Sequence, residues 1–145
     1  MATIQATIVI DRPIEEVFAF VADYSARAQW QSGIIESKII SDGPLAVGSQ
    51  YKYVAQVLGK RLDTAGEITE HQPPSRHGWK ATSGPFPLEG VFTFEEVDGG
   101  TRVTSTVEAE GDGFFKLAEP LVIRMVRRDF QTGFDNLKDL LEGAA

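Results

Sequence analysis

The sequence predicts an α+β domain in which a curved, seven-stranded antiparallel sheet wraps around a long C-terminal helix. Apolar and polar residues alternate with a period of two over most of the chain, which is typical of half-buried strands. Short turn-forming stretches separate these segments and favour antiparallel neighbours over parallel crossovers. From residue 113 onward the apolar spacing lengthens to that of a helix. The expected order is one strand, two helices, six strands and one helix, in a single domain of residues 1–145.

The N-terminal part predicts a strand followed by two short helices. Residues 3–10 alternate, and Asp11 is expected to cap a helix whose first turn contains Pro13. Two glutamates follow, where they complement the positive end of the helix dipole. The helical spacing breaks near Asp23 and resumes in a second helix that ends around Gln31.

Six further strands and a last helix complete the expected fold. The strands are predicted at residues 34–41, 49–58, 62–71, 77–83, 86–97 and 101–110. Gly59-Lys60 is a plausible two-residue turn, and Asp98-Gly99-Gly100 is the strongest hairpin signal. Pro120 lies either in the first turn of the helix or at a kink. The apolar stripe of this helix comprises Leu117, Leu121, Met125, Phe130, Phe134, Leu137 and Leu141.

The widths of these elements predict a gap beneath the sheet. A helix is about 10 Å wide, whereas seven strands at about 4.8 Å spacing span roughly 30 Å. One apolar sheet face must therefore curl around the helix, and the gap is filled either by large side chains or by a ligand. Small residues are expected on the inner face, where they either leave a cavity or let large neighbours pack. They are Ala55, Gly66, Ala81, Gly90 and Ser105.

Several segments resemble the START-like superfamily (SRPBCC), in its polyketide cyclase/dehydrase and lipid-transport branch. They are residues 8–18, Gln29-Trp30, residues 73–79 with a Pro-Pro and a tryptophan, and residues 137–142. The resemblance covers nearly the whole chain and implies the helix-grip fold with an internal cavity for a bulky apolar molecule. Members of the superfamily include ligand carriers, cyclases, hydrolases, quinone-binding proteins and chaperone co-factors, so the fold does not fix the function.

The expected wall of the cavity is mostly aromatic and aliphatic. Tyr51 and Tyr53 have hydroxyls that either orient a ligand or reach solvent and backbone. Trp30 either caps a ligand or seals the core. The predicted ligand-binding residues are Trp30, Tyr51, Tyr53, Ile68, Trp79, Leu88, Phe92, Ser105, Leu121 and Met125.

Two titratable residues are candidates for catalysis, each with a structural alternative. His77 shares strand parity with Trp79 and can face inward, or it is an ordinary hydrogen-bonded histidine after the Pro-Pro turn. Asp129 projects onto the apolar stripe of the last helix, where it can act as a base. Alternatively, the stripe rotates after Pro120 and leaves Asp129 among surface arginines. His71 is expected to be solvated.

The composition limits the kinds of partner and cofactor that the protein is expected to bind. With 14 basic and 21 acidic side chains the net charge is −7, and no basic stripe suits a nucleic acid. The chain has no cysteine and two histidines, so neither a metal site nor a cofactor is expected. No signal peptide or membrane-spanning run is visible, which makes the cytoplasm the default location. Monomer and homodimer are both left open.

Three functions fit these observations. The leading hypothesis is binding of a small hydrophobic ligand that is aromatic, polycyclic or lipid-like. The second is a cyclase or dehydratase that uses the same cavity, with His77, Asp129 or a tyrosine moving the proton. The third is a protein-binding adaptor whose cavity is vestigial.

Overall fold

The protein begins with a strand and three short helical segments that lead to the rest of the sheet. The computed structural model describes residues 2–31, 33–57, 59–84, 88–109 and 120–143. Strand β1 (Ala2–Ile10) is followed by α1 (Ile14–Val21), the 3-10 turn η1 (Tyr24–Ala26) and α2 (Arg27–Trp30). The predicted break near Asp23 is confirmed, since the Asp23 carboxylate accepts a hydrogen bond from the Ser25 backbone and starts η1 there.

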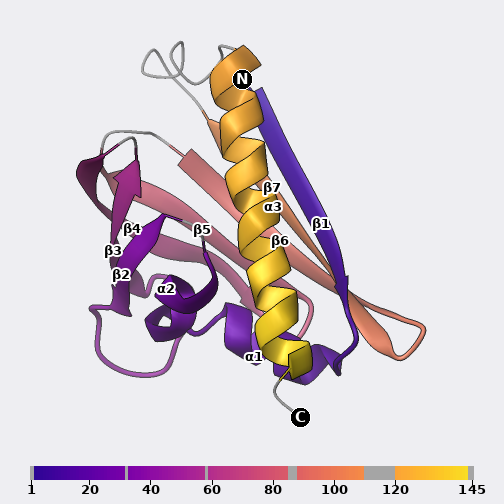
Figure 1. The fold of residues 1–145 in the computed structure, drawn as a ribbon. Helices are drawn as coiled ribbons and strands as arrows, with labels where there is room; N and C mark the ends of the chain where they lie inside the picture. Colours follow the sequence, from indigo (N-terminus) through magenta and orange to yellow (C-terminus); the bar gives the residue numbers. More distant parts are fainter. Residues whose placement is uncertain (1, 32, 58, 85–87, 110–119, 144–145) are drawn as a thin grey trace.

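Seven antiparallel strands form one sheet, as predicted. After β1 the strands are β2 (Ile34–Ile39), β3 (Gln50–Val57), β4 (Lys60–Gln72), β5 (Arg76–Ser83), β6 (Leu88–Val97) and β7 (Gly100–Ala109). Their order across the sheet is β1-β7-β6-β5-β4-β3-β2. The C-terminal helix α3 (Pro120–Gly143) begins at Pro120 and runs beside β1 across the curved sheet, while α1 and α2 lie near one end (Figure 1). The helix-grip fold is therefore confirmed.

The core lies between α1, α3 and the β1–β7–β6 side of the sheet. Apolar side chains from α1 and α3 meet the inner faces of these strands, and the sequence alternation predicts which residues point inward. A second cluster, farther along the sheet, joins Tyr24, Tyr51 and Ile68. The two clusters share the half-buried Trp79, so the core continues across the curve of the sheet.

The start of α1 differs from the prediction. Pro13, not Asp11, precedes the first helical residue, and no side chain caps this end. The Asp11 backbone N–H donates instead to the Glu142 carboxylate at 2.8 Å, and the Arg12 side chain donates to the Leu141 carbonyl at 2.8 Å. The Asp11 backbone thus attaches the β1–α1 connection to the end of α3. Local sequence rules do not predict this contact.

The two predicted hairpin turns differ in accuracy. Val97 pairs with Gly100, so Asp98 and Gly99 form the turn, with φ of 47° and 82° as a type I′ hairpin requires. At the other hairpin Lys60 already pairs with Val57. Gly59 belongs to that turn and Lys60 to the strand, so the predicted Gly59-Lys60 pair was wrong by one residue.

Two inner-face glycines are covered by aromatic rings rather than by empty space. A Cβ on Gly66 would clash with the Tyr51 hydroxyl and with the Lys80 carbonyl oxygen. Similarly, a Cβ on Gly90 would lie 2.6 Å from the Trp79 ring. At these two positions the small residue lets a large neighbour pack, which was one of the two expected alternatives.

We predict that Gly66→Ala destabilises the protein by about 1 to 3 kcal/mol, because the added carbon meets the backbone oxygen of Lys80, which cannot move aside without disturbing β5. Urea denaturation at neutral pH measures the change. Gly143→Ala is the matched control, since nothing lies within 4 Å of the added carbon there. Equal stability of the Gly66→Ala variant and the wild type would contradict the packing described here.

Candidate ligand-binding pocket

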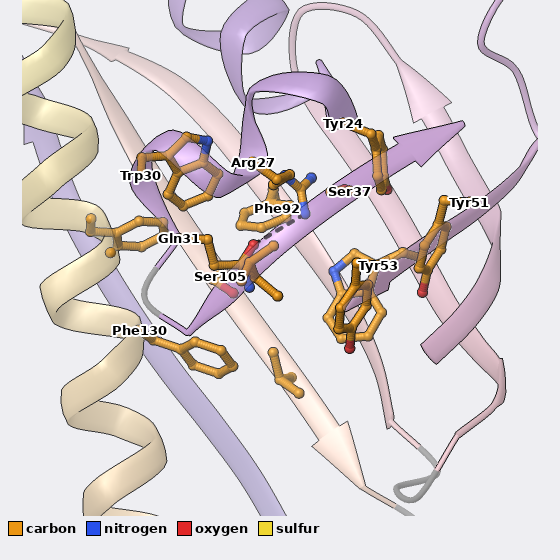
Figure 2. A pocket seen from close by; sticks show the side chains of 15 residues that line it. Tyr24, Arg27, Trp30, Gln31, Ser37, Tyr51, Tyr53, Phe92, Ser105 and Phe130 are labelled. Carbon is orange, nitrogen blue, oxygen red and sulfur yellow. Dashed lines mark hydrogen bonds between the residues drawn. The ribbon is translucent and has the colours of Figure 1, made fainter. Parts of the chain in front are cut away.

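An aromatic pocket lies between α2, α3 and the inner face of the sheet (Figure 2). The space between its atoms, including the part open to solvent, is about 610 Å³. The space that admits the centre of a water molecule is only about 40 Å³. The pocket is therefore narrow. Its lining comprises Tyr24, Arg27, Trp30, Gln31, Ile34, Ser37, Tyr51, Tyr53, Trp79, Phe92, Ser105, Val107, Phe130, Gly133 and Phe134.

The short helical segment η1–α2 supplies one wall. Tyr24, Arg27 and Trp30 are spaced three residues apart, so a helical turn places them on one face, and all three are buried. Trp30 stacks on Phe134 of α3, with ring centres 6.3 Å apart. The Asn136 side chain donates to the Trp30 carbonyl at 3.3 Å and so fastens α2 to α3.

Arg27 is buried in this wall, with 7% of its surface exposed. Its Nε and Nη2 donate to the Val21 carbonyl at 3.1 and 3.0 Å, which satisfies an oxygen at the end of α1. The guanidinium carbon lies 4.4 Å from the centre of the Tyr24 ring and 5.2 Å from that of Phe92. In Figure 2 Arg27 lies between Trp30 and Tyr24. Aromatic faces stabilise the cation, as expected of cation–π contacts.

Two buried polar atoms of the lining have no hydrogen-bond partner in the described part of the chain. They are the Tyr51 hydroxyl and the Trp30 indole nitrogen. Burial raises the pKa of Tyr51 above its usual 10, so the phenol stays protonated and can donate. Buried donors are ordinarily satisfied, so these two atoms are exceptions among the described residues.

Three side chains form a hydrogen-bonded chain from the pocket toward the outside. The Tyr24 hydroxyl lies 2.8 Å from His77 Nε2, and His77 Nδ1 lies 3.1 Å from His71 Nδ1. His77 is fully buried, whereas His71 is half-buried and borders a second hollow on the outer side of α1. Of the alternatives for His77, the structure has a buried, hydrogen-bonded histidine, whereas His71 is not simply solvated.

The protonation state of His77 limits how the hydrogen bonds between Tyr24, His77 and His71 can be arranged. Burial, with the positive charge of Arg27 and the neighbouring His71, lowers the pKa of His77 to about 3. His77 is therefore neutral and carries one ring proton. Either Tyr24 donates to His77 and His77 donates to His71, or both bonds are reversed. The two arrangements place the ring proton of His77 on different nitrogens, Nδ1 in the first and Nε2 in the second.

The predicted ligand-binding residues are only partly brought together. Those that line the pocket are Trp30, Tyr51, Tyr53, Trp79, Phe92 and Ser105. Ile68 is buried beside Tyr51 but does not line the pocket, and half-buried Leu88 does not line it either. The side chains of Leu121 and Met125 lie outside the described residues.

Asp129 is exposed and does not line the pocket. Of the two alternatives for Asp129, the structure therefore has the one in which the residue lies at the surface, and the catalytic alternative is wrong. Phe134, Leu137 and Leu141 of the predicted stripe are buried as expected, and this face of the helix points away from Asp129. A carboxylate left in water avoids the desolvation cost that an inward one would bear.

Sequence reasoning missed several lining residues, above all Tyr24 and Arg27. Their spacing from Trp30 was a usable signal, because three residues is one helical turn. Arginine is rarely buried, which made Arg27 a poor candidate for an interior position. Gln31, Ile34 and Ser37 were missed because the distance between α2 and β2 follows from the tertiary fold.

The described residues contain neither a cluster of three potential metal ligands nor a helix with the length and hydropathy needed to cross a membrane.

Comparison with known sequences identifies the family. Residues 1–142 match the family described as polyketide cyclase / dehydrase and lipid transport. The chain belongs to this family. No curated protein matches the sequence.

Solved structures share the fold at low sequence identity. TTHA0849 from Thermus thermophilus is 19% identical with a TM-score of 0.82, over 99% of this chain and 100% of that one. A START superfamily protein from Mycobacterium smegmatis is 14% identical with a TM-score of 0.82, over 99% of both chains. StfQ, a di-domain ARO/CYC protein of the steffimycin biosynthetic pathway, is 17% identical with a TM-score of 0.70, over 96% of this chain and 46% of that one. These likenesses establish the fold.

We predict that His77 makes stability depend on pH. The pKa of His77 is about 3 in the folded protein, which is below its value in the unfolded chain. At a pH between these two pKa values the unfolded state therefore binds more protons than the folded state. The stabilisation is complete above about pH 6.5 and is lost as the pH falls toward 3. Between about pH 7 and pH 4.5, the stability advantage of the wild type over His77→Gln should shrink by roughly 2 to 3 kcal/mol, measured by urea denaturation. An unchanged advantage would mean that His77 is not kept neutral by its surroundings.

Proposed function

We propose that the protein binds a small hydrophobic molecule, aromatic, polycyclic or lipid-like, in the pocket between the sheet, α2 and α3. The observation that carries the proposal is the lining, in which aromatic rings from six different elements converge on one space. Membership of a family described by cyclase, dehydrase and lipid-transport activities supports the same class of ligand. The di-domain ARO/CYC protein StfQ has the same fold, which agrees with an aromatic guest.

The binding energy would come mainly from removing apolar surface from water. Each 100 Å² of guest surface that is buried contributes about 2.5 kcal/mol, at about 25 cal/mol per Å². The pocket is narrow, so a bicyclic guest needs the lining to open. Tyr53 and Trp79 are half-buried members of the lining, and their rings can rotate at lower cost than the fully packed Tyr51.

We predict that filling the pocket abolishes binding of a neutral aromatic probe. Ser105 lines the pocket and faces Phe92 across the β6–β7 pair. Ser105→Leu should weaken binding of phenylnaphthylamine by at least about tenfold, because the larger side chain occupies the space of the guest. Fluorescence titration measures the affinity. Thr104→Leu, the next residue on the opposite face of β7, is the control and should bind like the wild type.

Two further results bear on this proposal. A hydrophobic compound extracted from the purified protein and detected by mass spectrometry would support it and name the ligand. If the wild type neither binds the probe nor gains thermal stability from any hydrophobic compound, the binding function is wrong, because a specific ligand of the native state must stabilise it. That result would favour the adaptor hypothesis, in which the pocket is vestigial.

A cyclase or dehydratase that uses the same pocket is the second candidate. The Tyr24–His77–His71 chain favours it, because it links a hydroxyl in the pocket to a titratable group nearer the solvent. In a dehydration, the substrate loses a proton from carbon to a water molecule, its carbon–oxygen bond breaks, and the departing hydroxide takes a proton from Tyr24 and leaves as water. His77 Nε2–H then returns a proton to Tyr24, His71 passes its Nδ1 proton to His77, and His71 takes up from solvent the proton that the substrate carbon released. Burial raises the pKa of Tyr24 while Arg27 lowers it, so Arg27 stabilises a transient phenolate.

We predict that, if this reaction occurs, Tyr24→Phe lowers the turnover of an aryl β-hydroxy ketone by about 100-fold or more, while the affinity changes little. The change removes the proton donor and keeps the ring. Formation of the conjugated ketone is followed by absorbance. Tyr53→Phe is the matched control, since Tyr53 lines the pocket without contacting either histidine. If the wild type binds the ketone without converting it, the dehydratase hypothesis is wrong and the binding function remains.

A further inference from the structure

We propose that the guest of this pocket is an acid, whose carboxylate pairs with Arg27 while its aromatic or polycyclic body lies against the rings. The inference rests on the proposed binding function and adds the chemical class of the ligand. It starts from an observation that the apolar lining does not explain, which is a buried cation without a counter-charge.

Arg27 has more hydrogen-bonding capacity than the protein uses. A guanidinium has five N–H donors. Two bonds go to the Val21 carbonyl and a third, at 3.4 Å, goes from Nη1 to the Gln31 side-chain oxygen. The Tyr24 side chain is a further hydrogen-bond partner of Arg27, so the described residues leave at least one N–H group unused, and the bond to Gln31 is long for a charged donor. The unused capacity belongs to a side chain that lines the pocket (Figure 2).

The pocket also has an excess of positive charge. Among the described residues that line the pocket, Arg27 has the one side chain that is charged at neutral pH. None of the ion pairs formed by the described residues includes Arg27. Burial holds the pKa values of Tyr24, Tyr51 and Tyr53 above their usual range, so these tyrosines do not supply the missing negative charge. A buried charge without a partner is costly, and an anionic guest removes that cost.

The other unsatisfied groups of the pocket are of the same kind. The Tyr51 hydroxyl and the Trp30 indole N–H are buried donors without acceptors among the described residues. With Arg27, the wall of the pocket thus contains unused hydrogen-bond donors beside a positive charge. A carboxylate has two oxygens and accepts several hydrogen bonds, including paired bonds from a guanidinium. A neutral hydrocarbon or an amine would leave these donors unpaired.

A purely structural role for Arg27 makes a different prediction. Its bonds to Val21 fix the end of α1, and the rings around it stabilise the cation. Removing Arg27 would then reduce stability, but the protein would not distinguish an acid from a neutral molecule of the same shape. The ratio of the affinities for an acid and for a neutral molecule of the same shape separates the binding role of Arg27 from the structural one. Any general weakening of the fold affects both affinities and cancels in their ratio.

The experiment compares naphthoate with naphthamide, which have the same shape and differ in charge. The wild type should bind naphthoate at least about tenfold more tightly, the effect of one charge-assisted hydrogen bond. In Arg27→Met the preference should disappear. Arg61→Met removes the same charge at a surface site, where 61% of the side chain is exposed, and should keep the preference. Calorimetric titration gives the affinities.

A second measurement does not depend on a variant that folds. In the wild type, the side-chain nitrogen resonances of Arg27 should shift when naphthoate is added and stay in place with naphthamide. Equal affinity for the two probes, or a preference that survives in Arg27→Met, would overturn the acid-binding inference and leave hydrophobic binding intact. If neither naphthoate nor naphthamide binds, while phenylnaphthylamine does, the acid-binding inference alone fails. If none of the three probes binds, the proposed function fails with it.

Discussion

The two edge strands of the sheet are consecutive in the chain, and this connectivity constrains everything else in the structure. β1 and β2 lie at opposite ends of the strand order, separated by the other five strands. Six strand spacings of about 4.8 Å amount to roughly 29 Å. The segment between residues 11 and 33 must cross this distance, and it does so as α1, η1 and α2, which close one end of the curved sheet (Figure 1). The pocket exists because this crossing segment and α3 cover different parts of the same concave face.

The crossing segment also explains how an arginine comes to be buried. Val21 ends α1 with a carbonyl that no later turn of that helix satisfies, and Arg27 reaches back to it. The rings of Tyr24, Trp30 and Phe92 surround the guanidinium. The cation is thus held by the protein but not neutralised by it. The same charge acts on His77, whose pKa it helps to lower, so one buried cation affects both the binding wall and the histidine chain.

Binding requires an apolar pocket wall, whereas catalysis requires groups that transfer protons, and this pocket has residues of both kinds. Apolar rings and a narrow space favour the capture of a flat, hydrophobic molecule. A hydroxyl connected through His77 to His71 adds a route for a proton, which a simple carrier does not need. Families with this fold carry several functions on one scaffold, so the polar side chains of the pocket, not the sheet, decide between them.

The sequence by itself determined the strands, the helices and the side of the sheet that each residue faces. Period-two alternation is a local property, so the inward direction of Tyr51 and Trp79 followed from it. The Asp98-Gly99 turn followed from its own residue types. Tertiary structure alone decided which side chains meet. Tyr24 and His77 are 53 residues apart, and no local rule pairs them. The rotation of α3 that exposes Asp129, and the burial of Arg27, depend on the desolvation and packing of the assembled layers, which no periodicity in the chain encodes.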